Sequence, residues 1–319
     1  MLFENLKWSD LKKVSLDTLP ICSIRAEVYD GSGNFLYRLK PLGALGKGAF
    51  AHVDKFEQIL ASGERRPVAL KRPREKGCTM LMEGLFQWKL YHELKPYGIQ
   101  FCVPQVYSIF RYLEFKDAWF LMEAFEPQLL SQWCVTHIRP ETSRLFPLLL
   151  LQIALILEVF EEALQIDHRD LKVNNLLVLN EPVYMNITWK GEERKLQFPF
   201  RVVFLDFGFA CKDMLYNLKE EDGIPGISGC PNPGRDFFQI LVSLWRLQSL
   251  RSCLEDTWGS WVRTCIQCVK LLVNFESLIH NTRDINTIYL LTEDPVFSAP
   301  LCTPSKVIAQ CMSFLDGKK

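Results

Sequence analysis

The sequence predicts an α+β protein made of two lobes, and three observations support this fold class. Short runs of β-branched and aromatic residues, separated by turn residues, fill the chain up to residue 125. Apolar residues at helical spacing dominate the remainder. The chain has 319 residues and no internal repeat, which suits one large domain or two packed lobes.

The first part of the chain is expected to be rich in strands. We place an N-terminal extension at residues 1–25 and the first lobe at residues 26–125. A turn, Asp-Gly-Ser-Gly-Asn at 30–34, separates the first two predicted strands. One helix, at 80–94, interrupts the series. The predicted strands are 24–29, 35–39, a strand ending at 60, 67–71, 103–110 and 118–125.

The second lobe is expected to span residues 126–319 and to be mostly helical. Its predicted helices cover 143–165, 236–250, 258–280 and 304–315. The most apolar run, Leu145–Leu157, has 13 residues without a charge. Because a bilayer-spanning helix needs ~20 such residues, this run predicts a buried helix.

The net charge and the N-terminal residues argue against several classes of protein. Lys+Arg and Asp+Glu both number 37, so the formal net charge is zero. This balance argues against bulk electrostatic attraction to nucleic acid or to a membrane. Residues 1–10 carry charges and no apolar run, unlike a secretory signal. We therefore expect an intracellular protein, in the cytoplasm or the nucleus.

The 11 cysteines are odd in number and scattered, which favours free thiols in a reducing compartment. Cys265 and Cys268 form a Cys-x-x-Cys pair within a predicted helix, where a spacing of three places both on one face. Two core thiols are expected in preference to a metal site, because no second pair at zinc spacing accompanies them.

Two motifs carry the chemistry. Residues 168–175 read His-Arg-Asp-Leu-Lys-Val-Asn-Asn, and residues 206–208 read Asp-Phe-Gly. They match the signatures H-R-D-L-x-x-x-N and D-F-G of protein kinases. The chain thus resembles the eukaryotic-type protein kinases, and a lysine two residues after the aspartate resembles their serine/threonine branch. The resemblance implies a two-lobed protein-kinase-like fold with a β-rich N-lobe and a helical C-lobe.

The resemblance assigns roles to the residues of these motifs. Asp170 is expected to be the catalytic base for the acceptor hydroxyl, and Lys172 to neutralise charge on the γ-phosphoryl group. Asn175 and Asp206 are expected to bind Mg²⁺, since this ion prefers oxygen ligands. The implied cofactors are ATP and Mg²⁺.

A glycine loop and a lysine precede these motifs, in the order that kinases show. Glycine allows the backbone to approach phosphates, and Lys71 in Val-Ala-Leu-Lys resembles the lysine that pairs with the α/β-phosphates. Ala51 occupies the third glycine position. The loop and strand residues expected to contact ATP are Leu45, Gly46, Lys47, Gly48, Ala49, Phe50, Val53 and Ala69.

A helical glutamate is expected to hold Lys71. Glu83, 12 positions later, is our first choice and Glu93 is the alternative. Within Trp119–Phe125 the resemblance makes Met122 the gatekeeper, and the backbone from Glu123 to Phe125 is expected to bind the adenine edge.

The chain also departs from the kinase pattern. Asn175 and Asp206 are 31 positions apart, against about a dozen in most kinases with this signature. Residues 182–200 are therefore an insertion, and their sequence predicts a hairpin around 190–193. The Ala-Pro-Glu motif is absent, and Asp236, which resembles a helix aspartate that caps the catalytic loop, lies only 30 positions after Asp206.

Two kinase subfamilies share parts of this pattern. An insertion before Asp-Phe-Gly with loss of Ala-Pro-Glu is similar to the haspin kinases, and the glycine loop is similar to that of the Bub checkpoint kinases. Haspin kinases differ at Asp-Phe-Gly and Bub kinases at His-Arg-Asp, whereas this chain keeps both. Only the general mechanism is carried over.

We therefore expect a monomeric Ser/Thr protein kinase that transfers the γ-phosphoryl group of Mg-ATP to a protein substrate. Neither a nucleic acid nor a membrane partner is expected. Two alternatives remain open. One is a pseudokinase scaffold that binds partners without turnover. The other, motivated by the missing Ala-Pro-Glu platform, is a kinase of a non-protein hydroxyl acceptor.

Overall fold

The structure is a computed structural model, and it divides the chain into two units. It describes residues 3, 6–48, 50–74, 80–113, 117–126, 128–139, 142, 144–212, 216–217, 230–254, 258–269, 292–294 and 296–317. Unit 1 comprises residues 1–96 and 103–127, and unit 2 comprises residues 97–102 and 128–319.

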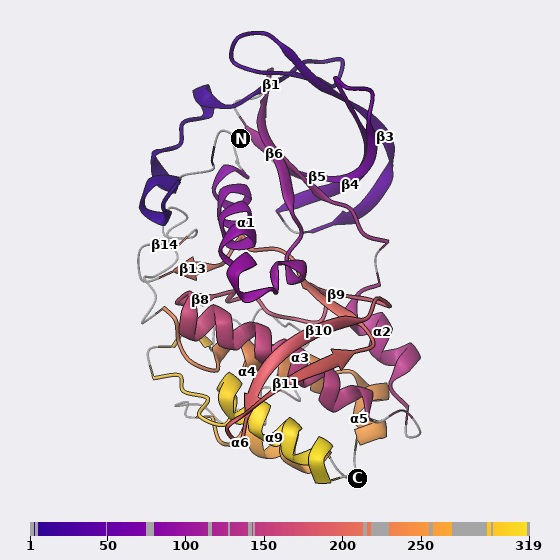
Figure 1. The fold of residues 1–319 in the computed structure, drawn as a ribbon, viewed down its shortest axis with the longest axis vertical. Helices are drawn as coiled ribbons and strands as arrows, with labels where there is room; N and C mark the ends of the chain where they lie inside the picture. Colours follow the sequence, from indigo (N-terminus) through magenta and orange to yellow (C-terminus); the bar gives the residue numbers. More distant parts are fainter. Residues whose placement is uncertain are drawn as a thin grey trace. The chain divides into compact units, whose positions relative to one another are not determined.

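Unit 1 is built around a closed barrel of seven strands in the order β1-β2-β3-β4-β5-β7-β6, which forms the ring of strands in Figure 1. The 3₁₀ turns η1 (Trp8–Lys13) and η2 (Leu16–Thr18) precede it. The strands are β1 (Ile21–Cys22), β2 (Glu27–Tyr29), β3 (Phe35–Lys47), β4 (Ala51–Leu60), β5 (Arg65–Pro73), β6 (Val106–Tyr112) and β7 (Ala118–Glu123).

The closed barrel shows that the predicted fold class is wrong, because a two-lobed protein-kinase fold does not have a closed barrel as its core. Closure depends on β1, which pairs antiparallel with β2 and parallel with β6, with Ile21 opposite Arg111. β1 lies inside the stretch that was expected to be an extension. The β3–β4 ladder also shifts register at Pro41/Gly43 and Ala44/Gly46, and such bulges increase strand curvature.

The interior of the barrel is apolar, as alternation along its strands requires. Its core consists of Cys22, Val28, Tyr37, Leu39, Val68, Leu70, Phe110 and Leu121. Helix α1 (Leu81–Glu93) contacts β6 and β7. A Cβ added at Gly84 would lie 3.0 Å from Cδ1 of Phe120, so the close approach of α1 to β7 favours glycine there.

Unit 2 contains the long apolar helix α3 (Leu145–Glu158), which contacts α4 (Arg235–Trp245) and α9 (Pro304–Gly317). A π-helical turn, Val159–Ala163, extends α3. Further helices of unit 2 are α2 (Leu130–His137), α5 (Gln248–Leu254) and α6 (Trp258–Gln267). A short 3₁₀ turn at Gln100–Cys102 also belongs to unit 2, whereas the turn at Lys95–Tyr97 begins in unit 1.

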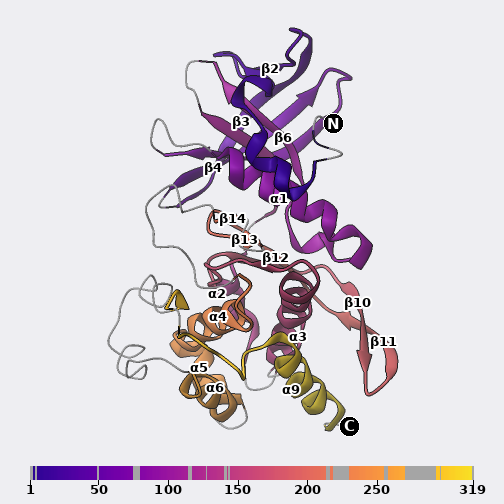
Figure 2. The ribbon, with the colours of Figure 1, turned by 90° about the vertical axis from the view of Figure 1, so that its left-hand side faces the viewer.

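The strands of unit 2 form three small sheets. β9 (Leu176–Leu179) pairs with β12 (Arg201–Phe204), and β8 (Ile166–Asp167) pairs with β13 (Cys211–Lys212), which also pairs with β14 (Tyr216–Asn217). β10 (Val183–Trp189) and β11 (Glu192–Phe198) form the hairpin predicted for the insertion. Figure 2 shows this hairpin beside α9.

Two of the helix predictions were wrong. The predicted helix 236–250 is divided into two helices, α4 and α5. The predicted helix that begins at 258 is α6, which ends at Gln267, so of the two cysteines expected in the core only Cys265 is buried, and Cys268 lies beyond the helix and is exposed. The remainder of the predicted helix, residues 270–280, lies outside the described residues. None of the helices in the described ranges combines the length and apolarity needed to cross a membrane.

The expectation that all cysteines are free thiols is also wrong. Cys211 and Cys230 form a disulfide across a sequence separation of 19 residues. Free thiols in the described part of the chain are Cys22, Cys102, Cys134, Cys253, Cys265, Cys268, Cys302 and Cys311.

Candidate functional site

The loop between β8 and β9 in unit 2 brings three of the expected catalytic residues together. Nζ of Lys172 lies 2.8 and 2.7 Å from the two carboxylate oxygens of Asp170. Nδ2 of Asn175 donates to the backbone oxygen of Asp170 at 2.8 Å and to its Oδ2 at 3.0 Å. The side chains of Asp170 and Lys172 keep 13% and 23% of their surface exposed, so both remain accessible from solvent.

Helix α4 fixes the backbone on which Asp170 sits. Asp236 is completely buried, and its two carboxylate oxygens accept from the backbone N–H groups of His168 at 2.5 Å and Arg169 at 2.7 Å. Arg169 has a φ of 66°, which is rare outside glycine. These two hydrogen bonds stabilise the unusual backbone immediately before Asp170.

Two further side chains of α4, neither of which was predicted from the sequence, also hold the backbone of this loop. Oε1 of Gln239 accepts from the N–H of Leu171 at 2.9 Å, and its Nε2 donates to the carbonyl of Arg169 at 2.9 Å. Oγ of Ser243 accepts from the N–H of Val173 at 3.1 Å. The sequence did contain a signal, because positions 236, 239 and 243 share one face of a helix in which every other residue after Arg235 is apolar.

Arg169 is buried and has a partner, Glu293, that no sequence motif indicated. Its Nη2 and Nε lie 2.8 and 3.2 Å from the two carboxylate oxygens of Glu293, while Nη1 donates to the carbonyl of Phe209 at 3.3 Å. The guanidinium is fully buried. Glu293 is 124 positions away in sequence, so only the folded chain reveals the pairing.

Asp206, one of the two expected metal ligands, follows β12 and has a φ of 65°. Its neighbour Leu205 is fixed on both sides, because its N–H donates to the carbonyl of Asn175 at 2.9 Å and its carbonyl lies 2.8 Å from Nε2 of His168. Because the hydrogen bonds between the Asn175 side chain and Asp170 use Nδ2, the amide oxygen of Asn175 is the atom suited to a cation. One carboxylate and one amide oxygen fit Mg²⁺.

In unit 1, Lys71 on β5 pairs with Glu83 on α1. Nζ and Oε1 are 2.5 Å apart, and the two side chains are only 9% and 8% exposed. The alternative partner, Glu93, instead forms an ion pair with Lys89 at 2.6 Å. The ion pair of Lys71 is therefore with Glu83.

The expected glycine loop is the end of the β3–β4 hairpin. Gly46 is opposite Val53 and Lys47 opposite His52, and the N–H of Gly48 donates to the carbonyl of Ala51 at 2.9 Å. A Cβ on Gly46 would meet no atom within 4 Å, so packing within the chain does not require glycine there. Leu45 is half-buried and Phe50 is 58% exposed, whereas Ala49 lies outside the described residues.

The expected adenine-binding strand is β7. Met122 is opposite Ala69 of β5, both are buried, and Nε2 of Gln87 lies 3.6 Å from Sδ of Met122. The N–H of Glu123 donates to the carbonyl of Gln105 at 2.9 Å, so that donor is already used within unit 1. Phe125 follows β7 and is half-buried.

Several carboxyl groups are buried around the start of α4. Burial, together with the charges of Asp167 and Asp236, raises the pKa of Glu161 to about 9. Burial and the charge of Asp236 raise the pKa of Asp167 to about 8. Burial also raises the pKa of Asp236, against the opposing effects of His168 and Arg235.

The expected site residues thus fall into two groups, one in each unit. Lys71, Glu83, the β3–β4 loop and Met122 belong to unit 1, and Asp170, Lys172, Asn175 and Asp206 belong to unit 2. Comparison with known proteins gives no independent assignment, because no protein-family model matches the chain and no curated protein matches it.

Proposed function

We propose that this chain is an ATP-dependent protein kinase that transfers the γ-phosphoryl group of Mg-ATP to serine or threonine hydroxyls. The proposal concerns the chemistry of the site residues and does not depend on a kinase fold, since a site can recur on different architectures. ATP as the phosphoryl donor, Mg²⁺ as the cation and a protein as the acceptor are each proposed here.

The observation that carries the proposal is the arrangement around Asp170. A carboxylate with a lysine 2.7 Å away and an amide donor 3.0 Å away can orient an acceptor hydroxyl and receive its proton. The same lysine can neutralise the charge that develops on the phosphoryl group in transfer. A purely structural ion pair would not need a loop whose backbone is held by three side chains of α4.

The other residues take roles that suit their surroundings. Asn175 and Asp206 would hold Mg²⁺, which bridges and neutralises the phosphate oxygens when bound. Lys71, kept in place by Glu83, would pair with the α/β-phosphates. The β3–β4 loop, with space around Gly46, would cover the phosphates through its backbone.

The test is transfer of labelled γ-phosphate from Mg-ATP to the protein itself and to a generic basic protein. We expect Asp170→Asn to lower turnover by about 10²- to 10⁴-fold while ATP still raises the melting temperature. Lys172→Met is expected to reduce turnover by about 10²- to 10³-fold. Lys71→Met and Asp206→Ala should abolish incorporation through loss of phosphate and cation contacts.

A matched control is Glu192→Gln, which changes a carboxylate that is 72% exposed on the β10–β11 hairpin. It should retain wild-type turnover. Equal activity in Asp170→Asn and wild type would refute the proposal. ATP binding without turnover in the wild-type protein, on both acceptors, would instead favour the scaffold alternative.

A further inference from the structure

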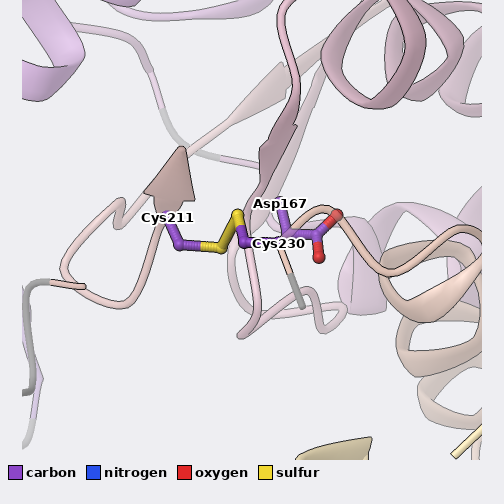
Figure 3. Close-up of side chains that lie close together, drawn as sticks. All are labelled: Asp167, Cys211 and Cys230. Carbon is purple, nitrogen blue, oxygen red and sulfur yellow. A yellow bond between two sulfur atoms is a disulfide. The ribbon is translucent and has the colours of Figure 1, made fainter. Parts of the chain in front are cut away.

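A cluster of metal-ligating side chains lies apart from the proposed phosphoryl-transfer residues. The carboxylate of Asp167 and the sulfurs of Cys211 and Cys230 offer ligand atoms that all lie within 4.8 Å of one another, and all three residues are buried. Figure 3 shows the three side chains together. The β8–β13 ladder creates this proximity, because Cys211 is the register partner of Asp167.

The carboxylate of Asp167 has one unsatisfied oxygen. Its Oδ2 accepts from the N–H of Asn232 at 2.7 Å and lies 3.5 Å from Nη1 of Arg235. Its Oδ1 is buried and has no hydrogen-bond partner within the part of the chain that the structure describes. Leaving a buried carboxylate oxygen without a partner is costly, and native structures rarely do so without an ion or a water nearby.

The two cysteines can exist in two chemical states. Joined as the disulfide, they have a Cα–Cα distance of 6.3 Å. Once reduced, the same pair presents two thiols beside Asp167. Two thiolates and one carboxylate form a ligand set that suits Zn²⁺, which commonly binds cysteine sulfur together with nitrogen or carboxylate oxygen.

The local charges also fit a divalent cation. Two thiolates and the Asp167 carboxylate carry three negative charges, of which Zn²⁺ neutralises two. The guanidinium of Arg235, completely buried, contributes positive charge 3.5 Å from Oδ2 of Asp167 and 3.8 Å from Oε1 of Glu293. The N–H of Asn232 orients the carboxylate from outside, as groups behind metal ligands commonly do.

We propose that the reduced protein binds one Zn²⁺ through the thiolates of Cys211 and Cys230 and a carboxylate oxygen of Asp167, with water as the fourth ligand. Zn²⁺ binding and the disulfide then exclude each other. A dithiol reductant breaks the S–S bond, donates two electrons and is itself oxidised to a disulfide, which leaves two thiols on the protein. Zn²⁺ binding displaces both thiol protons to solvent, together with the proton of Asp167 where that carboxyl is protonated.

Replacing the disulfide by Zn²⁺ would keep two segments of unit 2 connected. Cys211 follows Asp206 by five positions, and Cys230 precedes Asp236 by six. Either the disulfide or the metal joins these two segments, whereas the reduced, metal-free protein lacks both links. The proposal is independent of phosphoryl transfer, because it concerns metal content and can be tested without measuring activity.

The test measures Zn²⁺ binding by the full chain after reduction with a phosphine and removal of metal by a chelator. Competition with a chromophoric chelator gives the affinity, and elemental analysis after gel filtration gives the stoichiometry. We expect one Zn²⁺ per chain in the reduced protein and none in the oxidised protein. Co²⁺ in place of Zn²⁺ should produce a thiolate-to-metal charge-transfer band with tetrahedral d–d transitions.

Variants separate the three-ligand site from adventitious binding. Cys211→Ser and Cys230→Ser should each lose the charge-transfer intensity of one thiolate, and both they and Asp167→Asn should weaken Zn²⁺ binding more than tenfold. Cys268→Ser, at an exposed free thiol, is the matched control and should bind as the wild type does. Circular dichroism verifies that each variant is folded.

Three results would overturn the proposal. One is a folded, reduced wild-type protein that binds no Zn²⁺. Another is unchanged affinity in Asp167→Asn, which would mean that a bare dithiol binds the metal. The last is loss of binding in Cys268→Ser, which would assign the metal to other cysteines. Because the wild-type titration and the Co²⁺ spectrum need no variant, a misfolded Asp167→Asn protein would not prevent the test.

Discussion

At the scale of single residues, the ion pair between Lys71 and Glu83 depends on burial. Its two charged atoms are 2.5 Å apart, and neither side chain is more than 9% exposed. Breaking a buried pair by removing one partner typically costs about 3–5 kcal/mol, because the remaining charge stays desolvated. We therefore expect Glu83→Gln to lower the free energy of unfolding by about that amount in urea denaturation.

Glu93 provides a matched control on the same helix. It pairs with Lys89 one turn away, and its side chain is 35% exposed. Exposed pairs at this spacing contribute about 0.3–0.5 kcal/mol, so Glu93→Gln should shift the urea midpoint little. Similar losses in both variants would show that the buried pair has no special role in stability.

The residues of the candidate site are of two kinds, those close together in the sequence and those that contact the same loop from far along the chain. Asp170, Lys172 and Asn175 lie within six consecutive positions, and their spacing in the sequence already indicates a common site. Glu293 and Gln239 act on the same loop from 124 and 70 positions away. Such partners are selected by tertiary packing, which a local pattern does not encode, although polar residues on one face of an apolar helix were a usable signal.

At the scale of elements, the β10–β11 hairpin shows what local sequence can predict. Alternating residues flank Lys190-Gly191, and both turn residues have positive φ, 54° and 81°, as a two-residue hairpin turn with the twist of its strands requires. The sequence did not indicate which residue holds the hairpin against the rest of unit 2, a role that we call the anchor. Asp316 of α9 accepts from Nε1 of Trp189 at 3.0 Å and from Nη1 of Arg194 at 3.1 Å.

The anchor predicts a local effect of Asp316→Ala. The substitution removes the acceptor for both hairpin side chains, so the hairpin should open more often while the rest of unit 2 is unaffected. Hydrogen exchange followed by mass spectrometry should show faster exchange in peptides that cover residues 183–198. The pKa of Asp316 is lowered, first by the Trp189 hydrogen bond, so protonation of Asp316 in acid should weaken the same contacts. In the wild-type protein this should appear as lower protection of residues 183–198 after correction for the slower intrinsic exchange in acid.

Glu192→Gln is the control for the hairpin. Glu192 contacts Arg194 at 3.3 Å within the hairpin, whereas the hairpin side chains that contact Asp316 are those of Trp189, Lys190 and Arg194. Its exchange pattern should match the wild type. Unchanged protection in Asp316→Ala would mean that packing, and not this carboxylate, holds the hairpin in place.

At the scale of the whole molecule, the limits of the sequence prediction lie in the closure of the barrel. Most strands of the barrel were predicted within a few residues, because each shows its own periodicity and turn signals, although β3 continues to Lys47, well beyond its predicted end at 39. The short strands β8, β9, β12, β13 and β14 of unit 2 were not predicted. The closing strand β1 has only two residues, Ile21 and Cys22, and its parallel partner β6 begins 85 positions after Ile21. A strand of two residues is too short to show the alternation of apolar and polar residues that identifies a strand. The sequence therefore could not distinguish a closed barrel from an open sheet.

The buried carboxyl group of Glu161 predicts how stability depends on pH. Burial, aided by the charges of Asp167, Asp236 and Glu162, raises its pKa from 4.5 to about 9, although the N–H of Gly234 donates to it at 3.1 Å. The folded state therefore retains a proton that the unfolded state releases above about pH 4.5. Its stabilising contribution is complete below that pH and is lost as pH rises towards 9.

Glu161→Gln should remove this dependence while keeping the size of the side chain. In chelator-treated protein, we expect the urea midpoint of the wild type to fall from about pH 5 to about pH 9, and that of the variant to fall less. The raised pKa of Asp167, about 8, acts in the same direction and leaves a residual slope in the variant. Glu162→Gln, at the exposed neighbouring position, removes only the smallest of the effects on the pKa of Glu161 and should change the slope much less than Glu161→Gln does. Parallel slopes for wild type and Glu161→Gln would mean that Glu161 is ionised in the folded protein at neutral pH, with its charge compensated by another group.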